Sequence, residues 1–108
     1  MPKNRRFSVY WFDPEPTIGA ELRKVRPCVV VSPEEMNKVL RTVLIAPLTS
    51  TSKSWPFRID VTVNGKKSRV ACDQIRAVDK ARLKGYIEDL SDDDGEAVLA
   101  LLQTIFSK

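Results

Sequence analysis

The sequence predicts a small, mostly antiparallel β-barrel with helices packed outside it, and three observations lead to that class. Residues 28–31 and 42–48 are apolar and rich in β-branched side chains, which is typical of strands buried on both faces. Residues 57–63 alternate apolar with polar side chains, as a half-buried strand does, and end at the hairpin signal Asn64-Gly65. A helical stripe follows near the C-terminus. Strands, a short helix, further strands and a terminal helix are the order expected of such a barrel.

The first half of the chain is expected to contribute the early strands and a short helix. Residues 7–12 are aromatic-rich, which favours a first strand, whereas residues 13–25 hold two prolines and a glycine and favour a long loop. Ser32 is expected to cap a helix over 33–40, with Pro at its first position and Glu35 completing a capping box.

The second half is expected to continue the sheet and close with a helix. After the hairpin turn, residues 68–73 form the return strand, and two further short strands are expected over 75–79 and 84–89. Ser91 is the expected N-cap of the last helix, because the three aspartates that follow it suit a positive helix start. The apolar stripe of this helix consists of Val98, Leu101, Leu102 and Ile105.

Length and composition favour one domain over residues 1–108, with 43% hydrophobic residues to build its core. No apolar run reaches the roughly 18 residues of a membrane span, and no apolar region follows the basic start, so we expect neither membrane insertion nor a signal peptide. Cys28 and Cys72 both lie in apolar, strand-like segments. They are expected to be buried free thiols in a reducing cytoplasm.

The chain contains no histidine, which restricts the chemistry available to it. Acid–base catalysis must use carboxylates, hydroxyls or cationic side chains, because imidazole is absent. Two cysteines without histidine cannot form a standard zinc site, and no carboxylate cluster suggests another metal. We therefore expect no metal and no cofactor.

Charge is distributed unevenly along the sequence. Residues 1–84 hold 17 Lys/Arg and 8 Asp/Glu, whereas residues 85–108 hold one Lys and six acids. A basic body with an acidic C-terminal segment favours a polyanionic partner for the body, although many soluble domains carry uneven charge without binding nucleic acid.

Three polar segments stand at the ends of expected core strands. They are Glu21 with Arg23, Lys24 and Arg26; then Thr49-Ser50-Thr51; and then Asp73-Gln74 followed by Arg76. Loops at one end of a barrel can converge, and a carboxylate, an arginine and a hydroxyl together suit phosphoryl transfer on RNA. The carboxylate can accept a proton from a ribose 2′-hydroxyl, while the arginine and the hydroxyl stabilise charge on the phosphate oxygens.

Each segment also has a simpler interpretation, which the residues alone leave open. Arg26 can be an exposed arginine at a strand start, and Glu21 can be a solvated acid. Residues 49–54 can be a polar loop, and the Asp73-Gln74 pair can be a turn that satisfies its own backbone.

Aromatic side chains could add base stacking to such a site. Trp11 is expected in the core. Trp55, in a polar segment before a proline, is the better stacking candidate.

Four segments in a fixed order carry a family resemblance. They are 15–21 (EPTIGAE), 26–32 (RPCVVVS) with Asn37, 46–50 (APLTS), and 73–79 (DQIRAVD) with Arg82-Leu83. From about residue 9 to the end, the chain resembles the MazF/PemK/Kid toxins of bacterial toxin–antitoxin systems.

The resemblance implies a small SH3-like (CcdB/Kid-type) barrel that dimerises, with a short helix after strand 2 and a C-terminal helix. It implies a sequence-selective, metal-independent endoribonuclease toxin of the bacterial cytoplasm that cleaves single-stranded mRNA. In the family, attack by the ribose 2′-hydroxyl leaves a 2′,3′-cyclic phosphate and a 5′-hydroxyl. The implied protein partner is a cognate acidic antitoxin.

The family's functional residues fall on named positions of this chain. Its catalytic arginine, threonine and glutamate correspond to Arg26, Thr49 and Glu21, and its RNA-contacting acid–glutamine pair to Asp73 and Gln74. The other expected RNA-binding residues are Lys24, Ser50, Thr51, Lys53 and Arg76.

The chain departs from the family at two positions. Phe7-Ser8 stands where the family usually has Gly-Asp, and Val25 stands where some members have a histidine. Because the same barrel also serves the CcdB gyrase poison, two alternatives remain open: a non-enzymatic poison or nucleic-acid-binding barrel, and a degraded toxin that retains only antitoxin binding. The pair Arg26 and Thr49 favours the nuclease.

Overall fold

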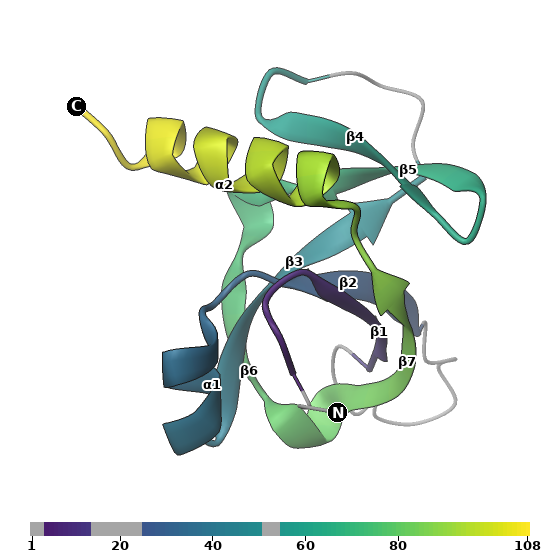
Figure 1. Ribbon diagram of the computed structural model, residues 1–108, viewed down its shortest axis with the longest axis vertical. Coiled ribbons are helices and arrows are strands. Elements are labelled where there is room, and N and C mark those ends of the chain that lie inside the picture. Colours follow the sequence, from purple (N-terminus) through teal and green to yellow (C-terminus); the bar gives the residue numbers. More distant parts are fainter. Residues whose placement is uncertain (1–3, 14–24, 51–54) are drawn as a thin grey trace, which may run out of the picture.

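The computed structural model describes residues 4–13, 25–50 and 55–108 (Figure 1). Its strands are β1 (Ser8–Phe12), β2 (Arg26–Val30), β3 (Thr42–Thr49), β4 (Arg58–Val63), β5 (Lys66–Ala71), β6 (Arg76–Asp79) and β7 (Leu83–Asp89). Its helices are α1 (Glu34–Val39) and α2 (Asp92–Ile105), and two 3₁₀ turns are η1 (Cys72–Gln74) and η2 (Lys80–Arg82). The mainly β class, with a short helix after the second strand and a C-terminal helix, is confirmed.

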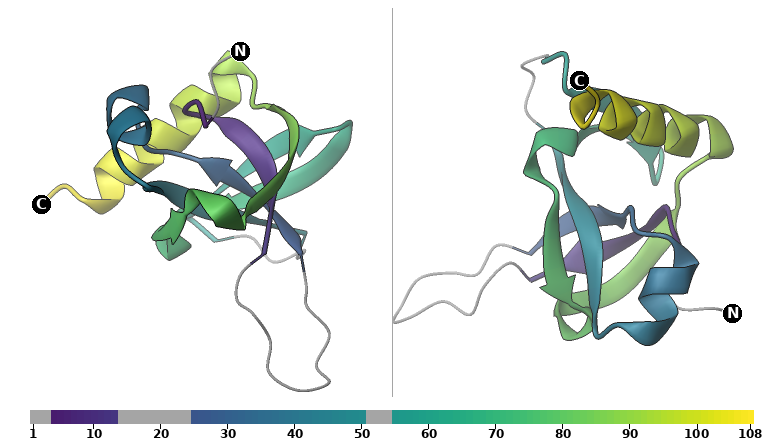
Figure 2. Two further views of the ribbon diagram at one scale, coloured as in Figure 1. Left: turned by 90° about the horizontal axis from the view of Figure 1, so that it is seen from below. Right: turned by 90° about the vertical axis from the view of Figure 1, so that its left-hand side faces the viewer.

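The strands form one curled antiparallel sheet in the order β4-β5-β3-β2-β1-β7, with β6 beside β3. β5 and β6 both pair with β3, β6 with its first half and β5 with its end, and η1 connects β5 to β6. The curl of the sheet brings the turn between β4 and β5 near β7, where the Asn64 N–H donates to Glu88 Oε2 (2.7 Å). β4 also contacts the start of α2, because the Thr62 N–H donates to Asp94 Oδ2 (3.3 Å). The sheet is therefore a half-barrel, and the helices lie well apart on its outside (Figure 2).

The central strands are buried on both faces, as their sequences predict. In β2, Val29 belongs to one core cluster, whereas Cys28 and Val30 belong to the other. Alternate residues of a strand point to opposite faces, so the sheet separates two apolar cores. The larger core lies beneath α2, whose Val98 is fully buried in it.

The expected capping box at α1 is wrong. The helix begins after Pro33, which occupies the N-cap position without a side-chain hydrogen bond. Ser32 is buried instead, where its hydroxyl accepts from the Leu44 N–H (3.0 Å) and donates to Asn37 Oδ1 (2.5 Å). A buried backbone N–H without an acceptor is costly, so the Ser32 hydroxyl accepts from the Leu44 N–H and does not cap the helix.

The hairpin turn and the cap of α2 are confirmed. Asn64 and Gly65 both have positive φ, 54° and 74°, as a two-residue hairpin turn requires. Ser91 Oγ accepts from the Asp94 N–H (3.1 Å), which caps the helix. The apolar stripe is buried as far as Leu102, but Ile105 is 38% exposed at the helix end.

Cys28 and Cys72 are buried free thiols, as expected. Trp11 is not a core residue: it is 44% exposed, and the prediction for it is wrong. It lies opposite Pro27 of β2 and lines a surface hollow together with Leu48 and Val63. Among the residues that the structure describes, no helix is both long and apolar enough to cross a bilayer.

Candidate functional site

Arg26 is the first residue of β2. It lies opposite Phe12 of β1, and Pro27 restricts its backbone to an extended conformation. Its side chain is exposed, and no side chain of the described residues forms a hydrogen bond or ion pair with its guanidinium. A rigid strand therefore presents this cation to solvent.

Thr49 ends β3, the strand next to Arg26. The β2–β3 register sets Cys28 opposite Pro47, and continuing it by two residues sets Arg26 opposite Thr49. On its other side, Thr49 lies opposite Arg69 of β5. Residues directly opposite each other in antiparallel strands have Cβ atoms about 5 Å apart and share a face of the sheet. The Thr49 hydroxyl is thus flanked by an arginine from each neighbouring strand.

This pairing extends into a row across five strands. Arg69 lies opposite Asp60 of β4, and its Nε donates to Asp60 Oδ1 at 2.8 Å. The row, named here the Arg26–Thr49 row, consists of Phe12, Arg26, Thr49, Arg69 and Asp60. All five share the face on which the smaller core cluster lies.

Arg76 adds a further cation beside the row. It begins β6 opposite Ile45, four residues before Thr49 and hence on the same face of β3. Its guanidinium carbon lies 5.7 Å from the centre of the Phe12 ring, a cation–π contact. Three arginines from β2, β5 and β6 therefore share one face of the sheet.

Asp73 and Gln74 lie in η1, which interrupts the edge of the sheet between β5 and β6. Both side chains are exposed. The Asp73 carboxylate accepts from Arg58 Nε (3.2 Å) and Nη2 (3.4 Å), so an ion pair holds it against the start of β4. Burial raises the pKa of the adjacent Cys72 thiol to about 11, and the negative charge of Asp73 adds to that rise.

Aromatic rings continue the surface beyond this ion pair. The rings of Trp55 and Phe57 stack with centroids 5.5 Å apart and an interplanar angle of 17°. The Arg58 guanidinium lies 5.9 Å from the centre of the Phe57 ring. Trp55 is partly exposed, as a stacking candidate requires.

The other predicted residues divide into two groups. Ser50 is exposed directly after β3, next to the row. Glu21, Lys24, Thr51 and Lys53 lie outside the described residues.

Arg69 and Asp60 are not among the residues predicted from the sequence, although one signal for their pairing is present. The two-residue turn Asn64-Gly65 fixes the hairpin register, which sets residue 60 opposite residue 69. That Arg69 also faces Thr49 depends on the pairing of β3 with β5, for which the sequence carries no local signal.

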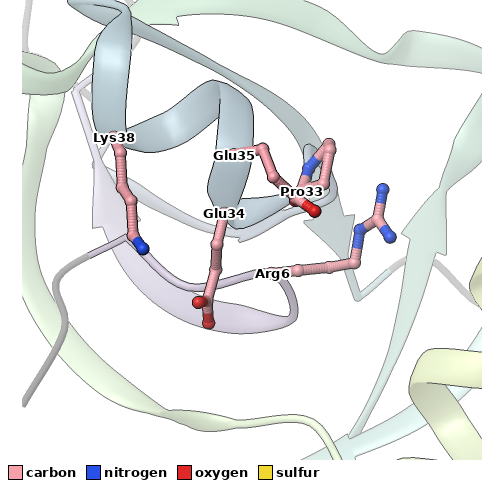
Figure 3. Close-up of a pocket in the computed structure, with 5 residues that line it drawn as sticks. All are labelled: Arg6, Pro33, Glu34, Glu35 and Lys38. Carbon is pink, nitrogen blue, oxygen red and sulfur yellow. The ribbon is translucent and has the colours of Figure 1, made fainter.

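Two surface hollows lie away from the row. One, of about 190 Å³, is lined by Trp11, Pro27 and Leu48 with residues of the β4–β5 hairpin, on the other face of the sheet. The other, of about 370 Å³, lies beside α1 and is lined by Arg6, Pro33, Glu34, Glu35 and Lys38 (Figure 3). There Arg6 Nε donates to the Val31 carbonyl (2.9 Å), and its guanidinium is turned away from Glu34 and Lys38. Of the predicted site residues that the structure describes, none lines the α1 hollow.

The row has the chemistry of a phosphodiester site. Guanidinium groups bind phosphate oxygens in two-pronged geometry, and a hydroxyl between them can donate to the same oxygens. The cations flank Thr49 from both sides, so a phosphate there would receive charge and a hydrogen bond together.

Comparisons with known proteins identify the family of the chain. The family model of the PemK-like, MazF-like toxin of type II toxin–antitoxin systems matches residues 5–106. Over 105 residues the chain is 30% identical to the endoribonuclease EndoA of Bacillus subtilis (strain 168), covering 92% of this chain and 90% of that protein.

Solved structures share the fold. The MazF structure (Form-I) from Deinococcus radiodurans matches with a TM-score of 0.77 and 25% identity, covering 94% of each chain. A MazE–MazF structure (Form-II) from the same organism matches with a TM-score of 0.82 and 25% identity, over 94% of this chain and 93% of that one. Since the family model spans nearly the whole sequence, the chain belongs to the PemK-like, MazF-like toxin family of type II toxin–antitoxin systems.

Proposed function

We propose that this toxin-family chain is a sequence-selective endoribonuclease that cleaves single-stranded mRNA without a metal ion. The observation that carries the proposal is the position of Arg26 and Thr49 at the ends of neighbouring strands on one face of the sheet. The relationship to the endoribonuclease EndoA supports the same reaction class.

The proposed reaction is an attack by the ribose 2′-oxygen on the adjacent phosphorus. A bond forms between the 2′-oxygen and phosphorus, and the bond from phosphorus to the 5′-oxygen of the next nucleotide breaks. The products are a 2′,3′-cyclic phosphate and a 5′-hydroxyl. Glu21 accepts the 2′-hydroxyl proton, and the departing 5′-oxygen takes a proton from solvent.

Arg26 and Thr49 act on the charge that develops during this attack. The Arg26 guanidinium neutralises the non-bridging phosphate oxygens, and the Thr49 hydroxyl donates to one of them. A guanidinium holds its proton firmly and is a poor proton donor, so the role of Arg26 is electrostatic.

The remaining predicted residues bind the RNA on either side of the cut. Lys24, Lys53 and Arg76 hold backbone phosphates, and binding therefore weakens as salt rises. Asp73 and Gln74 read base edges, since a carboxylate and an amide discriminate between donors and acceptors. Ser50 and Thr51 complete the contacts next to Thr49.

We also propose the setting of this activity. The chain is one toxin domain over residues 1–108 that acts as a homodimer in the bacterial cytoplasm. A cognate acidic antitoxin neutralises it by covering the basic face, as its family implies. Val39 and Phe106, 78% and 72% exposed, are apolar surface that a second copy of the chain could cover.

The test is incubation of the purified protein with a long single-stranded RNA in EDTA, followed by mapping of the cut ends. The proposal expects discrete cuts that end in cyclic phosphate. A single 2′-deoxyribose placed at a mapped cut should abolish cleavage there while neighbouring cuts continue. Intact RNA from a folded protein would instead favour a non-enzymatic poison, and inhibition of gyrase would be measured next.

A further inference from the structure

We infer that Arg69 is a second RNA-phosphate ligand of the Arg26–Thr49 row, and that Asp60 holds it in a poised, competing ion pair. The inference rests on the proposed function, because it takes single-stranded RNA as the ligand. Neither residue belongs to the motifs that carry the family resemblance.

The position of Arg69 carries the first step of the argument. It lies opposite Thr49, on the side away from Arg26, and both arginines share the face of that hydroxyl. An extended arginine side chain reaches farther than the roughly 5 Å between opposite Cβ atoms. A phosphate held at Thr49, or the next one along the strand, is therefore within reach of the Arg69 guanidinium.

The state of its ion pair carries the second step. Arg69 Nε lies 2.8 Å from Asp60 Oδ1, and the side chain of Asp60 is 79% exposed whereas that of Arg69 is 22% exposed. Because the carboxylate of this pair is exposed to water and screened by it, the pair contributes little net stability, so a phosphate can replace the carboxylate. Without RNA, the carboxylate holds the guanidinium on the β4 side, away from Thr49, and its negative charge repels RNA that is not fully bound.

Comparison with Arg58 supports a binding role for Arg69 over a purely structural one. Arg58, on the same face of the hairpin, forms two hydrogen bonds with Asp73, and its side chain is 14% exposed. That arginine serves the fold by anchoring η1. Arg69 instead pairs with an acid on the edge strand β4 whose side chain is 79% exposed, compared with 32% for Asp73.

The experiment measures affinity for a short single-stranded RNA with 2′-fluoro riboses, which cannot undergo 2′-hydroxyl attack. Arg69→Ala is expected to weaken binding roughly tenfold at low salt, as loss of a charged hydrogen bond does. The slope of log K against log salt should fall by about 0.7, the loss of one phosphate contact on a single strand. Arg69→Lys should keep that slope and recover part of the affinity.

Lys66→Ala is the matched control. It removes one positive charge from the same strand, but Lys66 lines the Trp11 hollow on the other face of the sheet. Its salt slope should equal that of the parent. An Arg69→Ala protein with the parent's affinity and slope, whatever its melting temperature, would overturn the inference.

Asp60→Asn tests the competing ion pair. It keeps the size of the side chain and removes the charge, so the affinity for the 2′-fluoro RNA should rise. In the Arg69→Ala background the same substitution should bring no gain, because its effect passes through Arg69. Equal gains in both backgrounds would contradict the proposed competition.

These readouts are separate from the test of the proposed function. Failure of the parent to cleave unmodified RNA, with Arg69-dependent binding intact, would reject the nuclease and keep the phosphate ligand. Normal cleavage and binding by Arg69→Ala would reject the ligand and keep the nuclease.

Discussion

Two buried polar side chains, Ser32 and Asn37, hold α1 against the sheet and the N-terminal segment. The Asn37 amide donates to the carbonyls of Ser32 (2.9 Å) and Asn4 (2.6 Å), while the Ser32 hydroxyl links Asn37 to the Leu44 N–H. Removing one member leaves buried partners unsatisfied, which costs more than a hydrogen bond at the surface.

Ser32→Ala is therefore expected to lower the free energy of unfolding by about 1–3 kcal/mol. Ser107→Ala is the control, because that hydroxyl bonds only to the exposed C-terminal turn. Urea unfolding of both variants checks the difference. A Ser32→Ala protein as stable as Ser107→Ala would show that the buried network contributes nothing.

The Cys28 thiol is fully buried between β1 and β3, and burial raises its pKa from 9.0 to about 12. The folded state therefore keeps the proton that the unfolded chain loses. The contribution of this protonated thiol to the free energy of unfolding is fully present below pH 9. It is lost as the pH rises towards 12, by up to about 1.4 kcal/mol per pH unit.

This linkage predicts a steeper alkaline loss of stability for the parent than for Cys28→Ala. Urea unfolding at about pH 8 and about pH 10 measures it, and the difference between the two proteins isolates this thiol from the lysines and from Cys72. Parallel pH profiles would mean that Cys28 ionises as readily in the fold as in the unfolded chain.

At the scale of elements, α2 depends on a close contact at its first turns. A Cβ at Gly95 would lie 2.6 Å from Phe7 Cδ2, and Phe7 itself is held at a φ of 73°. Glycine here lets the helix approach the aromatic ring that precedes β1. In an open helix, glycine to alanine would stabilise by about 1 kcal/mol.

Gly95→Ala is expected to reverse that sign and destabilise the protein by about 1–3 kcal/mol, because the ring must shift. Thermal unfolding compares it with Glu96→Ala, an exposed change in the same helix that should be nearly neutral. A rise in melting temperature for Gly95→Ala would refute the contact.

The elements could be predicted where local signals govern them. Alternation in β4, the positive-φ pair Asn64-Gly65 and the Ser91 cap all depend on neighbours in sequence. Ser32 and Trp11 were misassigned because residues distant in sequence decide their surroundings. Ser32 accepts from a β3 N–H, and Trp11 lines a surface hollow with the β4–β5 hairpin.

Part of the candidate site could be predicted from the sequence and part could not. The resemblance identified Arg26 and Thr49 by motif, and strand ends are visible in the sequence. The position of Arg69 opposite Thr49 depends on the β3–β5 register, which joins segments far apart in sequence. Non-local pairing of this kind has no signal in a single sequence.

At the scale of the whole molecule, the proposed homodimer predicts a sedimentation mass twice that of one chain. Burial of exposed apolar residues such as Val39 and Phe106 would supply part of the driving force. Sedimentation equilibrium over a range of concentrations measures the mass. A single-chain mass throughout that range would reject the dimer and leave the fold unaffected.

The central claim is that the strand-end arginine of β2 performs electrostatic catalysis of RNA cleavage. Its most direct measurement is the cleavage rate of Arg26→Ala in EDTA beside the parent, with circular dichroism of both. Arg41→Ala, which removes the same charge from an exposed turn before β3, is the control. We expect Arg26→Ala to lose roughly 100-fold or more in rate with an unchanged spectrum, and Arg41→Ala to cut normally. An Arg26→Ala protein that cuts RNA at the parent rate would contradict the account.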